Sequence, residues 1–207
     1  TGLIGDVGAW VAAEACRQIR AWTAQGLPPV SVAVNVSPIQ FRRRGFRQRL
    51  LRVIEDAGID PSCLQLEVTE STVMENVDDV IEALTEIKAV GVRIALDDFG
   101  TGYSSLGLLT SLPLDKIKID QSFVRRLERE ESSVAVTRAI VALGSSLKLQ
   151  VVGEGIENEA ALNHLRAIGC DQAQGYLISR PLPADEFVDW WRLQASDAAG
   201  GLRRAAH

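Results

Sequence analysis

Six short runs rich in apolar residues recur along this chain, and each run leads into a polar residue. The six polar residues are Asn35, Glu67, Asp97, Lys118, Glu154 and Gln174. Such runs are compatible with strands that are buried on both faces of a parallel sheet. In a parallel barrel the carboxyl ends of all strands meet at one rim, and that rim holds the active site. The pattern therefore predicts one site for a metal or a phosphate, assembled from distant parts of the sequence.

Strands and helices are predicted to alternate along the chain. The predicted strands cover 30–36, 63–69, 92–97, 115–119, 149–154 and 172–177. The predicted helices cover 6–25, 38–57, 77–90, 104–110, 133–147, 158–168 and 184–194. This alternation indicates an α/β fold, with a parallel sheet and helices outside it. A closed barrel of this type, a TIM-like (β/α)8 barrel, has eight strands. Because the chain opens with Thr1 and shows six, we expect about two N-terminal strands to be missing.

Length and composition narrow the class of protein. The 207 residues predict one domain over 1–194 and a disordered tail over 195–207. Hydrophobic residues make up 46% of the chain and no apolar run reaches membrane-spanning length, so we expect a globular domain without a membrane span. The net charge of −5 argues against binding to long nucleic acid. An acidic protein that binds a phosphate usually needs a metal cation to mediate the contact.

The three cysteines of the chain indicate the cellular compartment in which the protein works. Cys16, Cys63 and Cys170 are far apart, odd in number and in no CxxC pair. This usage is typical of reduced structural thiols. We therefore predict a cytoplasmic location, including the cytoplasmic part of a membrane-anchored parent.

The strongest local signal is the segment from Asp97 to Ser105, DDFGTGYSS. Two adjacent carboxylates leave a predicted strand and enter a loop that contains two glycines. Paired acids at such a rim can ligate one or two hard cations. Glycines allow a sharp backbone path and the close approach of a ligand. An isolated Asp-Asp pair would more simply be an acidic turn, but the glycine and serine continuation favours the site.

The chain resembles the EAL-domain family, the bacterial cyclic-di-GMP phosphodiesterases, over nearly its whole length. The order and spacing of the motifs carry the resemblance. They are Asn35-Val36-Ser37, Glu67-Val68-Thr69-Glu70, the Asp97–Ser105 loop, Lys118-Ile119-Asp120-Gln121-Ser122-Phe123, Glu154-Gly155-Ile156-Glu157 and Gln174-Gly175-Tyr176. Ser179-Arg180-Pro181 is a weaker match.

The resemblance implies a two-metal site. Asn35, Glu67 and Asp97 would ligate one divalent metal, and Asp98 would help to hold a second. Two metals can lower the pKa of a water molecule and neutralise the charge that develops on a phosphodiester during in-line attack. Oxygen ligands suit Mg²⁺ or Mn²⁺. The sequence has no cluster of His or Cys that would compete for zinc.

The resemblance also implies roles for residues that are not metal ligands. Lys118 would orient the nucleophilic water or stabilise phosphate charge, and Glu154 would be the general base. Glu157 and Gln174 would line the substrate pocket. Glu70 would steady the 98–105 loop, which in the family links metal binding to dimer contacts.

The chain departs from the family at the glutamate of the Glu-Ala-Leu motif. That glutamate is a metal ligand on an early strand, which would lie upstream of Thr1. The chain does contain Glu82-Ala83-Leu84, but this triplet falls within a predicted amphipathic helix. Glu82 lies on the polar side of that helix, so we interpret the match as a coincidence.

Two further features have a simpler and a functional interpretation. Six arginines between Arg42 and Arg52 could attract an anionic partner, but a solvated helix face is the simpler reading. Trp190 and Trp191 on the last helix are expected to pack on the outside of the barrel, with a partner contact as the alternative.

The leading hypothesis is metal-dependent hydrolysis of cyclic-di-GMP to linear pGpG in bacterial second-messenger signalling. The resemblance implies this enzyme activity for the parent domain. It also implies a homodimer and attached sensory or cyclase domains. Whether this chain alone is active stays open. The alternative is a non-catalytic EAL-type domain that senses cyclic-di-GMP or binds a protein partner. The parent sequence upstream of Thr1 discriminates between the two hypotheses.

Overall fold

The computed structural model describes residues 3–43, 45–102, 106–197 and 203–204. The chain divides into two compact units. The first unit comprises Thr1–Leu96 and Ser104–Asp115, and the second comprises Asp97–Tyr103 and Lys116–His207. Strand β3 (Arg93–Phe99) passes from the first unit into the second between Leu96 and Asp97.

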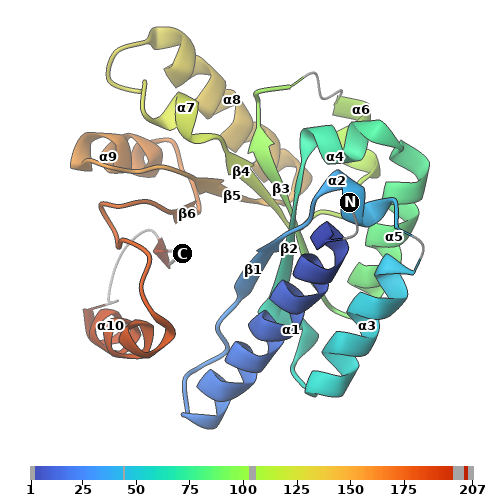
Figure 1. The fold of residues 1–207 in the computed structure, drawn as a ribbon. Coiled ribbons are helices and arrows are strands. Elements are labelled where there is room, and N and C mark those ends of the chain that lie inside the picture. The colour runs from blue at the N-terminus through green and yellow to red at the C-terminus, as the bar shows by residue number, and fades with distance from the viewer. Residues whose placement is uncertain (1–2, 44, 103–105, 198–202, 205–207) are drawn as a thin grey trace. The chain divides into compact units, whose positions relative to one another are not determined.

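In the first unit, strands alternate with helices that pack on them (Figure 1). In chain order its elements are α1 (Leu3–Ala24), β1 (Val32–Asn35), α2 (Pro38–Phe41), α3 (Phe46–Ala57), the 3-10 turn η1 (Pro61–Cys63), β2 (Leu64–Thr69), α4 (Glu70–Glu75), α5 (Val77–Ala89), the start of β3, and α6 (Leu106–Ser111). Strands β1 and β2 are parallel, with Val32 opposite Leu64 and Asn35 opposite Glu67. The predicted apolar spacing of α5 is confirmed, because Val80, Leu84 and Ile87 are buried.

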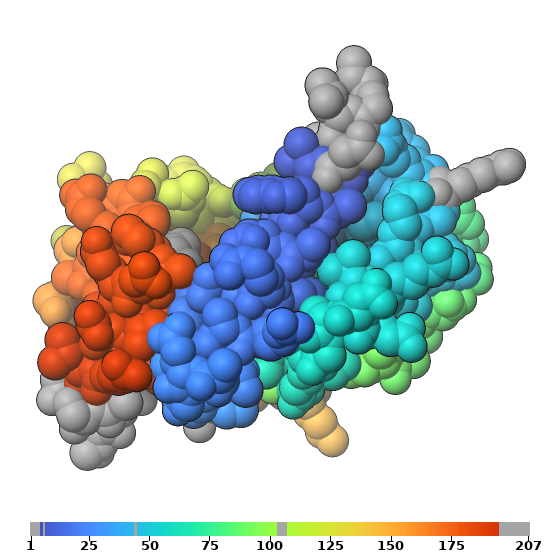
Figure 2. All heavy atoms as spheres, turned by 60° about the horizontal axis from the view of Figure 1, so that its bottom comes forward, coloured from blue at the N-terminus to red at the C-terminus, as the bar shows by residue number. Residues whose placement is uncertain are grey.

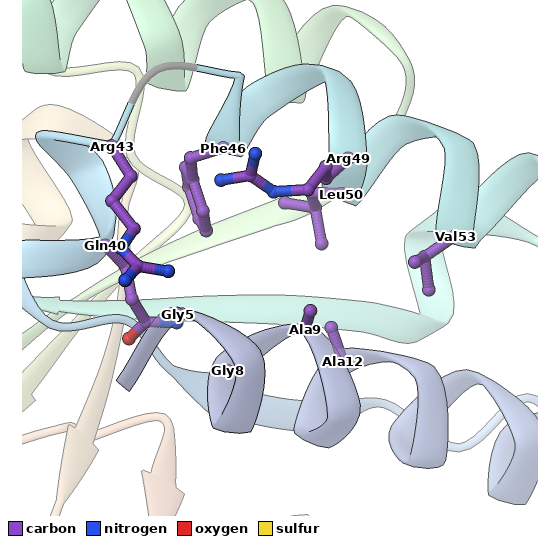
Figure 3. Close-up of a pocket in the computed structure, with 10 residues that line it drawn as sticks. All are labelled: Gly5, Gly8, Ala9, Ala12, Gln40, Arg43, Phe46, Arg49, Leu50 and Val53. Atoms are coloured by element: carbon purple, nitrogen blue, oxygen red, sulfur yellow. The ribbon is translucent and has the colours of Figure 1, made fainter. Parts of the chain in front are cut away.

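Helix α1 packs against α3 and β1. Two glycines on α1 allow the chain around α2 to approach closely. A Cβ added at Gly5 would overlap the guanidinium of Arg43, and one added at Gly8 would overlap the carboxamide of Gln40. Figure 3 shows both side chains reaching toward α1 at one end of a pocket that Phe46 also lines. The other side of α1, blue in Figure 2, lies on the surface, where Trp10 is 65% exposed.

The second unit contains the end of β3 followed by further parallel strands and their helices. In chain order its remaining elements are β4 (Lys116–Ile119), α7 (Gln121–Val124), α8 (Glu131–Leu147), β5 (Gln150–Gly153), α9 (Glu159–Ala167), β6 (Gln172–Ala173), α10 (Ala184–Asp197) and β7 (Arg203–Arg204). Parallel pairing places Lys118 opposite Val152, and Gly153 opposite Ala173. Helix α8 packs on β4 and β5, whose Ile117 and Val151 are buried.

Each of the six predicted strands is found among the residues that the structure describes, but several boundaries differ. The predicted helix 38–57 is two helices, because Gly45 adopts a left-handed conformation (φ 77°) that begins α3. The last predicted strand is shorter, since a turn follows Ala173. Short helices α4 and α7 were not predicted, because they have only six and four residues and offer no periodicity.

The C-terminal segment differs in part from the predicted tail. Helix α10 continues to Asp197, because helix-compatible residues run past 194 without a glycine or proline before Gly200. Arg203–Arg204 pair in parallel with β6. The other residues of 195–207 lie outside the described part of the chain, and for them the disordered tail stays a prediction. Within the described residues, no helix combines the length and apolar character needed to cross a membrane.

Candidate active site

The end of β3 brings two carboxylates to the start of a loop. Residues 94–96 of this strand are buried, and Asp97 and Asp98 follow them. The backbone N–H of Asp98 donates a hydrogen bond to Oδ1 of Asp97 at 3.0 Å. Asp98 adopts a left-handed conformation with φ 55°, which is uncommon for a residue with a side chain and recurs at functional sites. The backbone thus places the two carboxylates close together at one strand end.

Lys118 connects the end of β3 to the end of β5. Its side chain is 5% exposed, and Nζ lies 3.1 Å from Oδ1 of Asp97 and 2.7 Å from Oε1 of Glu154. The side chains of Asp97 and Glu154 are also largely buried, at 13% and 15% exposed. A lysine is rarely this buried unless it is paired. The ammonium group therefore compensates the charge of two carboxylates that would otherwise repel each other.

Three carboxylates of the second unit converge on one point. Oxygen atoms of Asp97, Asp98 and Glu154 all lie within 4.8 Å of one another. Carboxylate oxygens are the preferred ligands of Mg²⁺, Mn²⁺ and Ca²⁺. The donor set therefore fits a hard divalent cation.

The electrostatics of Asp98 agree with a cation site. Partial burial raises the pKa of the Asp98 carboxyl group. The neighbouring carboxylates of Asp97 and Asp120 raise this pKa further, whereas Lys118 lowers it. Repulsion among the carboxylates thus disfavours a charged Asp98. A divalent cation among them would reverse this effect and favour the charged form.

Asp120 is a member of this group that the sequence reasoning missed. Its carboxylate raises the pKa of Asp98, and its Oδ1 accepts a hydrogen bond from the backbone N–H of Ser122 at 2.9 Å. A signal was present, because Asp120 directly follows β4, and the residues after parallel strands gather at one rim.

The loops that follow β5 and β6 are joined by backbone hydrogen bonds. The N–H of Ile156 donates to the carbonyl oxygen of Gln174 at 3.1 Å, and the N–H of Gln174 donates to that of Gly153 at 2.9 Å. Gln174 therefore lies beside the segment that carries Glu154. Glu157 projects from the same segment and pairs with Arg125 at 2.8 Å, with both side chains about half exposed.

Asn35, Glu67 and Glu70 belong to the first unit. Asn35 and Glu67 are direct partners at the carboxyl ends of β1 and β2. Glu67 is buried, and its Oε1 accepts a hydrogen bond at 3.1 Å from Nε2 of Gln65, a buried neighbour that the sequence reasoning did not single out. Glu70 is the first residue of α4 and is also buried.

The Asp97–Ser105 loop is described only in part, since residues 103–105 lie outside the described residues. In its first half, the hydroxyl group of Thr101 donates to the carbonyl oxygen of Asp98 at 2.9 Å. Gly100 has φ 98°, and an added Cβ there would be 3.0 Å from the ring of Phe123. This glycine thus satisfies both a backbone and a packing requirement.

A known protein family matches most of this chain. The sequence model of the EAL domain matches residues 1–181. The chain belongs to the EAL domain family.

Two relatives of this EAL domain are named for cyclic-di-GMP turnover, both from Pseudomonas aeruginosa. The bifunctional diguanylate cyclase/cyclic di-GMP phosphodiesterase MucR is 44% identical over 188 residues, which are 91% of this chain and 27% of MucR. The cyclic di-GMP phosphodiesterase NbdA is 39% identical over 202 residues, 98% of this chain and 26% of NbdA. The chain thus spans about a quarter of the length of these relatives.

Solved structures confirm the predicted α/β fold of the EAL type, which is TIM-barrel-like. The phosphodiesterase of MucR in complex with c-di-GMP is 44% identical, with a TM-score of 0.87 over 90% of this chain and 76% of that one. Klebsiella pneumoniae BlrP1, in a calcium and cyclic-di-GMP complex, is 29% identical, with a TM-score of 0.76 over 85% of this chain and 44% of that one.

The Glu82-Ala83-Leu84 triplet of this EAL domain lies in α5, outside any strand. The side chain of Glu82 is 70% exposed and lies 3.6 Å from Nη1 of Arg47. This position confirms that the triplet falls on the polar side of a helix, as predicted.

The arginine-rich segment and the tryptophan pair have structural partners. Arg42 pairs with Glu75 at 2.9 Å and Arg47 with Glu86 at 2.6 Å. The rings of Trp190 and Trp191 lie 5.9 and 5.8 Å from the buried Phe187. The ion pairs agree with a solvated face, whereas the ring contacts lie within α10 and leave the role of the tryptophan pair a prediction.

Proposed function

We propose that this EAL domain hydrolyses cyclic-di-GMP to linear pGpG in a reaction that depends on divalent metal. The observation that carries the proposal is the buried group of Asp97, Lys118 and Glu154, in which one ammonium lies between two carboxylates. Burying charges in this way is costly for a domain that needs only to fold. Homology to the phosphodiesterases MucR and NbdA supplies the substrate class.

Asp97 would hold one divalent metal and Asp98 would help to hold a second, in an oxygen cluster that includes Glu154. We propose Asn35 and Glu67 as further ligands of the first metal, and Asp98 as a ligand of a second. Mg²⁺ or Mn²⁺, when bound, lowers the pKa of a water molecule and offsets the negative charge of the phosphodiester.

Lys118 and Glu154 would then act on the reacting groups. The Glu154 carboxylate would accept a proton from the attacking water, as a general base. The Lys118 ammonium, 2.7 Å from Glu154, would orient that water or stabilise charge on the phosphate. The water oxygen would form the new bond to phosphorus as the bond to one ribose oxygen breaks. That ribose oxygen would take up a proton from solvent and leave as a hydroxyl group, so that the ring opens to pGpG.

The remaining residues would serve binding and assembly. Glu157 and Gln174 would contact the substrate, since they flank the segment that carries Glu154. Glu70 would steady the 98–105 loop and link the metal site to contacts in a homodimer. We further propose attachment to sensory or cyclase modules and a cytoplasmic location, both typical of second-messenger signalling.

The test is chromatography of the products that the natural full-length protein forms from cyclic-di-GMP. We expect pGpG in Mg²⁺ or Mn²⁺, no product in excess EDTA, and little product in Ca²⁺, whose larger and more flexible coordination shell positions water poorly. Equal turnover with and without EDTA would exclude the metal mechanism. Cyclic-di-GMP binding without turnover under any of these conditions would favour the sensing alternative.

A further inference from the structure

Gly175, in the loop after β6, lies unusually close to another part of the backbone. A Cβ added there would overlap the backbone N and O of Ile156 and would lie 2.7 Å from its Cα. Because all three are backbone atoms, no side-chain rotation could make room for it. At Gly169 of the same unit, by contrast, an added Cβ would meet no described atom within 4 Å.

The residue that Gly175 approaches is fixed on several sides. Ile156 has a fully buried side chain, and its N–H donates to the carbonyl oxygen of Gln174 at 3.1 Å. Its own carbonyl oxygen accepts from the N–H of Leu177 at 3.0 Å. The backbone of Ile156 is thus held in the loop after β6, with Gly175 between the two hydrogen-bonding residues.

Glu154 lies two residues before Ile156 and is constrained from the opposite side as well. Its N–H donates to the carbonyl oxygen of Ile119 at 3.3 Å. Gly155 has φ +66°, and a Cβ added there would lie 2.5 Å from Cβ of Gln121. The Glu154 carboxylate therefore reaches Lys118 from a segment that is held between the end of β4 and the loop after β6.

We propose that Gly175 is a positioning residue for the carboxylates of Glu154 and Glu157. A side chain at position 175 must displace the backbone of Ile156, and this displacement moves the residues on both sides of it. Glu154 would then lose its place beside Lys118 and among the oxygens of Asp97 and Asp98. Gly175 itself need not touch substrate or metal. The proposal rests on the proposed function for its effect on turnover, but its effect on metal binding can be measured separately.

The test compares Gly175→Ala with Gly169→Ala in the natural full-length protein. Gly169 has φ +82°, so Gly169→Ala strains the backbone without displacing any neighbour and serves as a matched control for lost stability. Binding of Mn²⁺ alone is followed by electron paramagnetic resonance, together with the melting temperature and with kcat and KM for cyclic-di-GMP.

Gly175→Ala should weaken Mn²⁺ binding by about 10- to 100-fold, as when the support of a metal ligand is removed. It should lower kcat by about 10²-fold, the cost of misplacing a reacting group by roughly 1 Å. Gly169→Ala should retain wild-type Mn²⁺ affinity and kcat even where its melting temperature falls. Wild-type Mn²⁺ affinity and kcat in Gly175→Ala would overturn the proposal, as would equal losses in Gly169→Ala.

A second variant tests the positioning role of Gly175 if Gly175→Ala does not fold. Leu177→Pro removes the N–H that donates to Ile156 but adds no atom at position 175. Leu177→Pro should also weaken Mn²⁺ binding and lower kcat. An unchanged Mn²⁺ affinity and kcat would count against the proposal. A wild-type protein that binds Mn²⁺ but does not hydrolyse cyclic-di-GMP would contradict the proposed function, while the Mn²⁺ measurements would still decide the role of Gly175. Absence of both activities in the wild type would contradict both proposals.

Discussion

Ion pairs of similar length occur in two different environments of this EAL domain. In the second unit, Lys118 is 5% exposed and lies between two largely buried carboxylates. In the first unit, Arg47 pairs with Glu86 at 2.6 Å, but those side chains are 27% and 45% exposed. Water can replace the partner of an exposed charge, whereas a buried charge has no such substitute. The distance between two charges therefore does not separate the two pairs, whereas their joint burial does.

The largest effect should follow the loss of Lys118. Lys118→Met leaves Asp97 and Glu154 facing each other without a cation, and we expect the metal-free domain to lose about 3–5 kcal/mol of unfolding free energy. Urea unfolding followed by tryptophan fluorescence measures this change. Adding Mg²⁺ should restore part of it, because the metal would replace the missing positive charge. A loss of unfolding free energy below about 1 kcal/mol, as for exposed ion pairs, would show that burial does not distinguish the Lys118 group from the Arg47 pair.

A smaller but specific effect is expected from Asp97→Asn. The amide keeps the shape of the side chain but removes a negative charge from the oxygen cluster. Mn²⁺ affinity should fall by at least about 100-fold. Removing a residue that only supports a metal ligand already weakens metal binding by up to about 100-fold, and Asp97 would be a ligand itself. Hydrolysis should be abolished. Isothermal titration with Mn²⁺ tests this, with Asp185→Asn in the first turn of α10 as the control. Unchanged affinity in Asp97→Asn would exclude it as a ligand.

The smallest effect should come from Arg47→Met. Methionine keeps much of the apolar stem and removes only the exposed charge. The unfolding free energy should fall by no more than about 1 kcal/mol. Cyclic-di-GMP turnover should remain at the wild-type rate. A loss as large as that of Lys118→Met would show that burial does not separate the two pairs.

The strand ends were predictable because an apolar run followed by a polar residue is a local pattern. Asp97 and Glu154 could be named as site residues from such runs and from the family resemblance. The contact of Lys118 with Glu154 could not be derived, because these residues are far apart in sequence and meet only through the pairing of β4 with β5. The family resemblance gave Glu154 the role of a base, whereas the structure also brings it among the carboxylates that could bind a metal.

The close approach of Gly175 to Ile156 shows a second limit of sequence reasoning. A glycine in a loop has many possible reasons, and only the structure reveals that a backbone lies where a Cβ would be. The break between α2 and α3 is similar, since the arginine-rich segment around Gly45 reads as continuous helix until the left-handed conformation of this glycine is seen. Neither feature has a periodic signal in the sequence.

The most direct test of the account is the turnover of Glu154→Gln in the natural full-length protein with Mg²⁺. Glutamine keeps the size of the side chain but cannot accept the proton, so kcat should fall by about 10²–10⁴-fold. Cyclic-di-GMP binding, measured by calorimetry, should persist, and Glu159→Gln on the exposed first turn of α9 should behave as wild type. Wild-type turnover by Glu154→Gln would contradict the claim that the buried group around Lys118 is the catalytic centre.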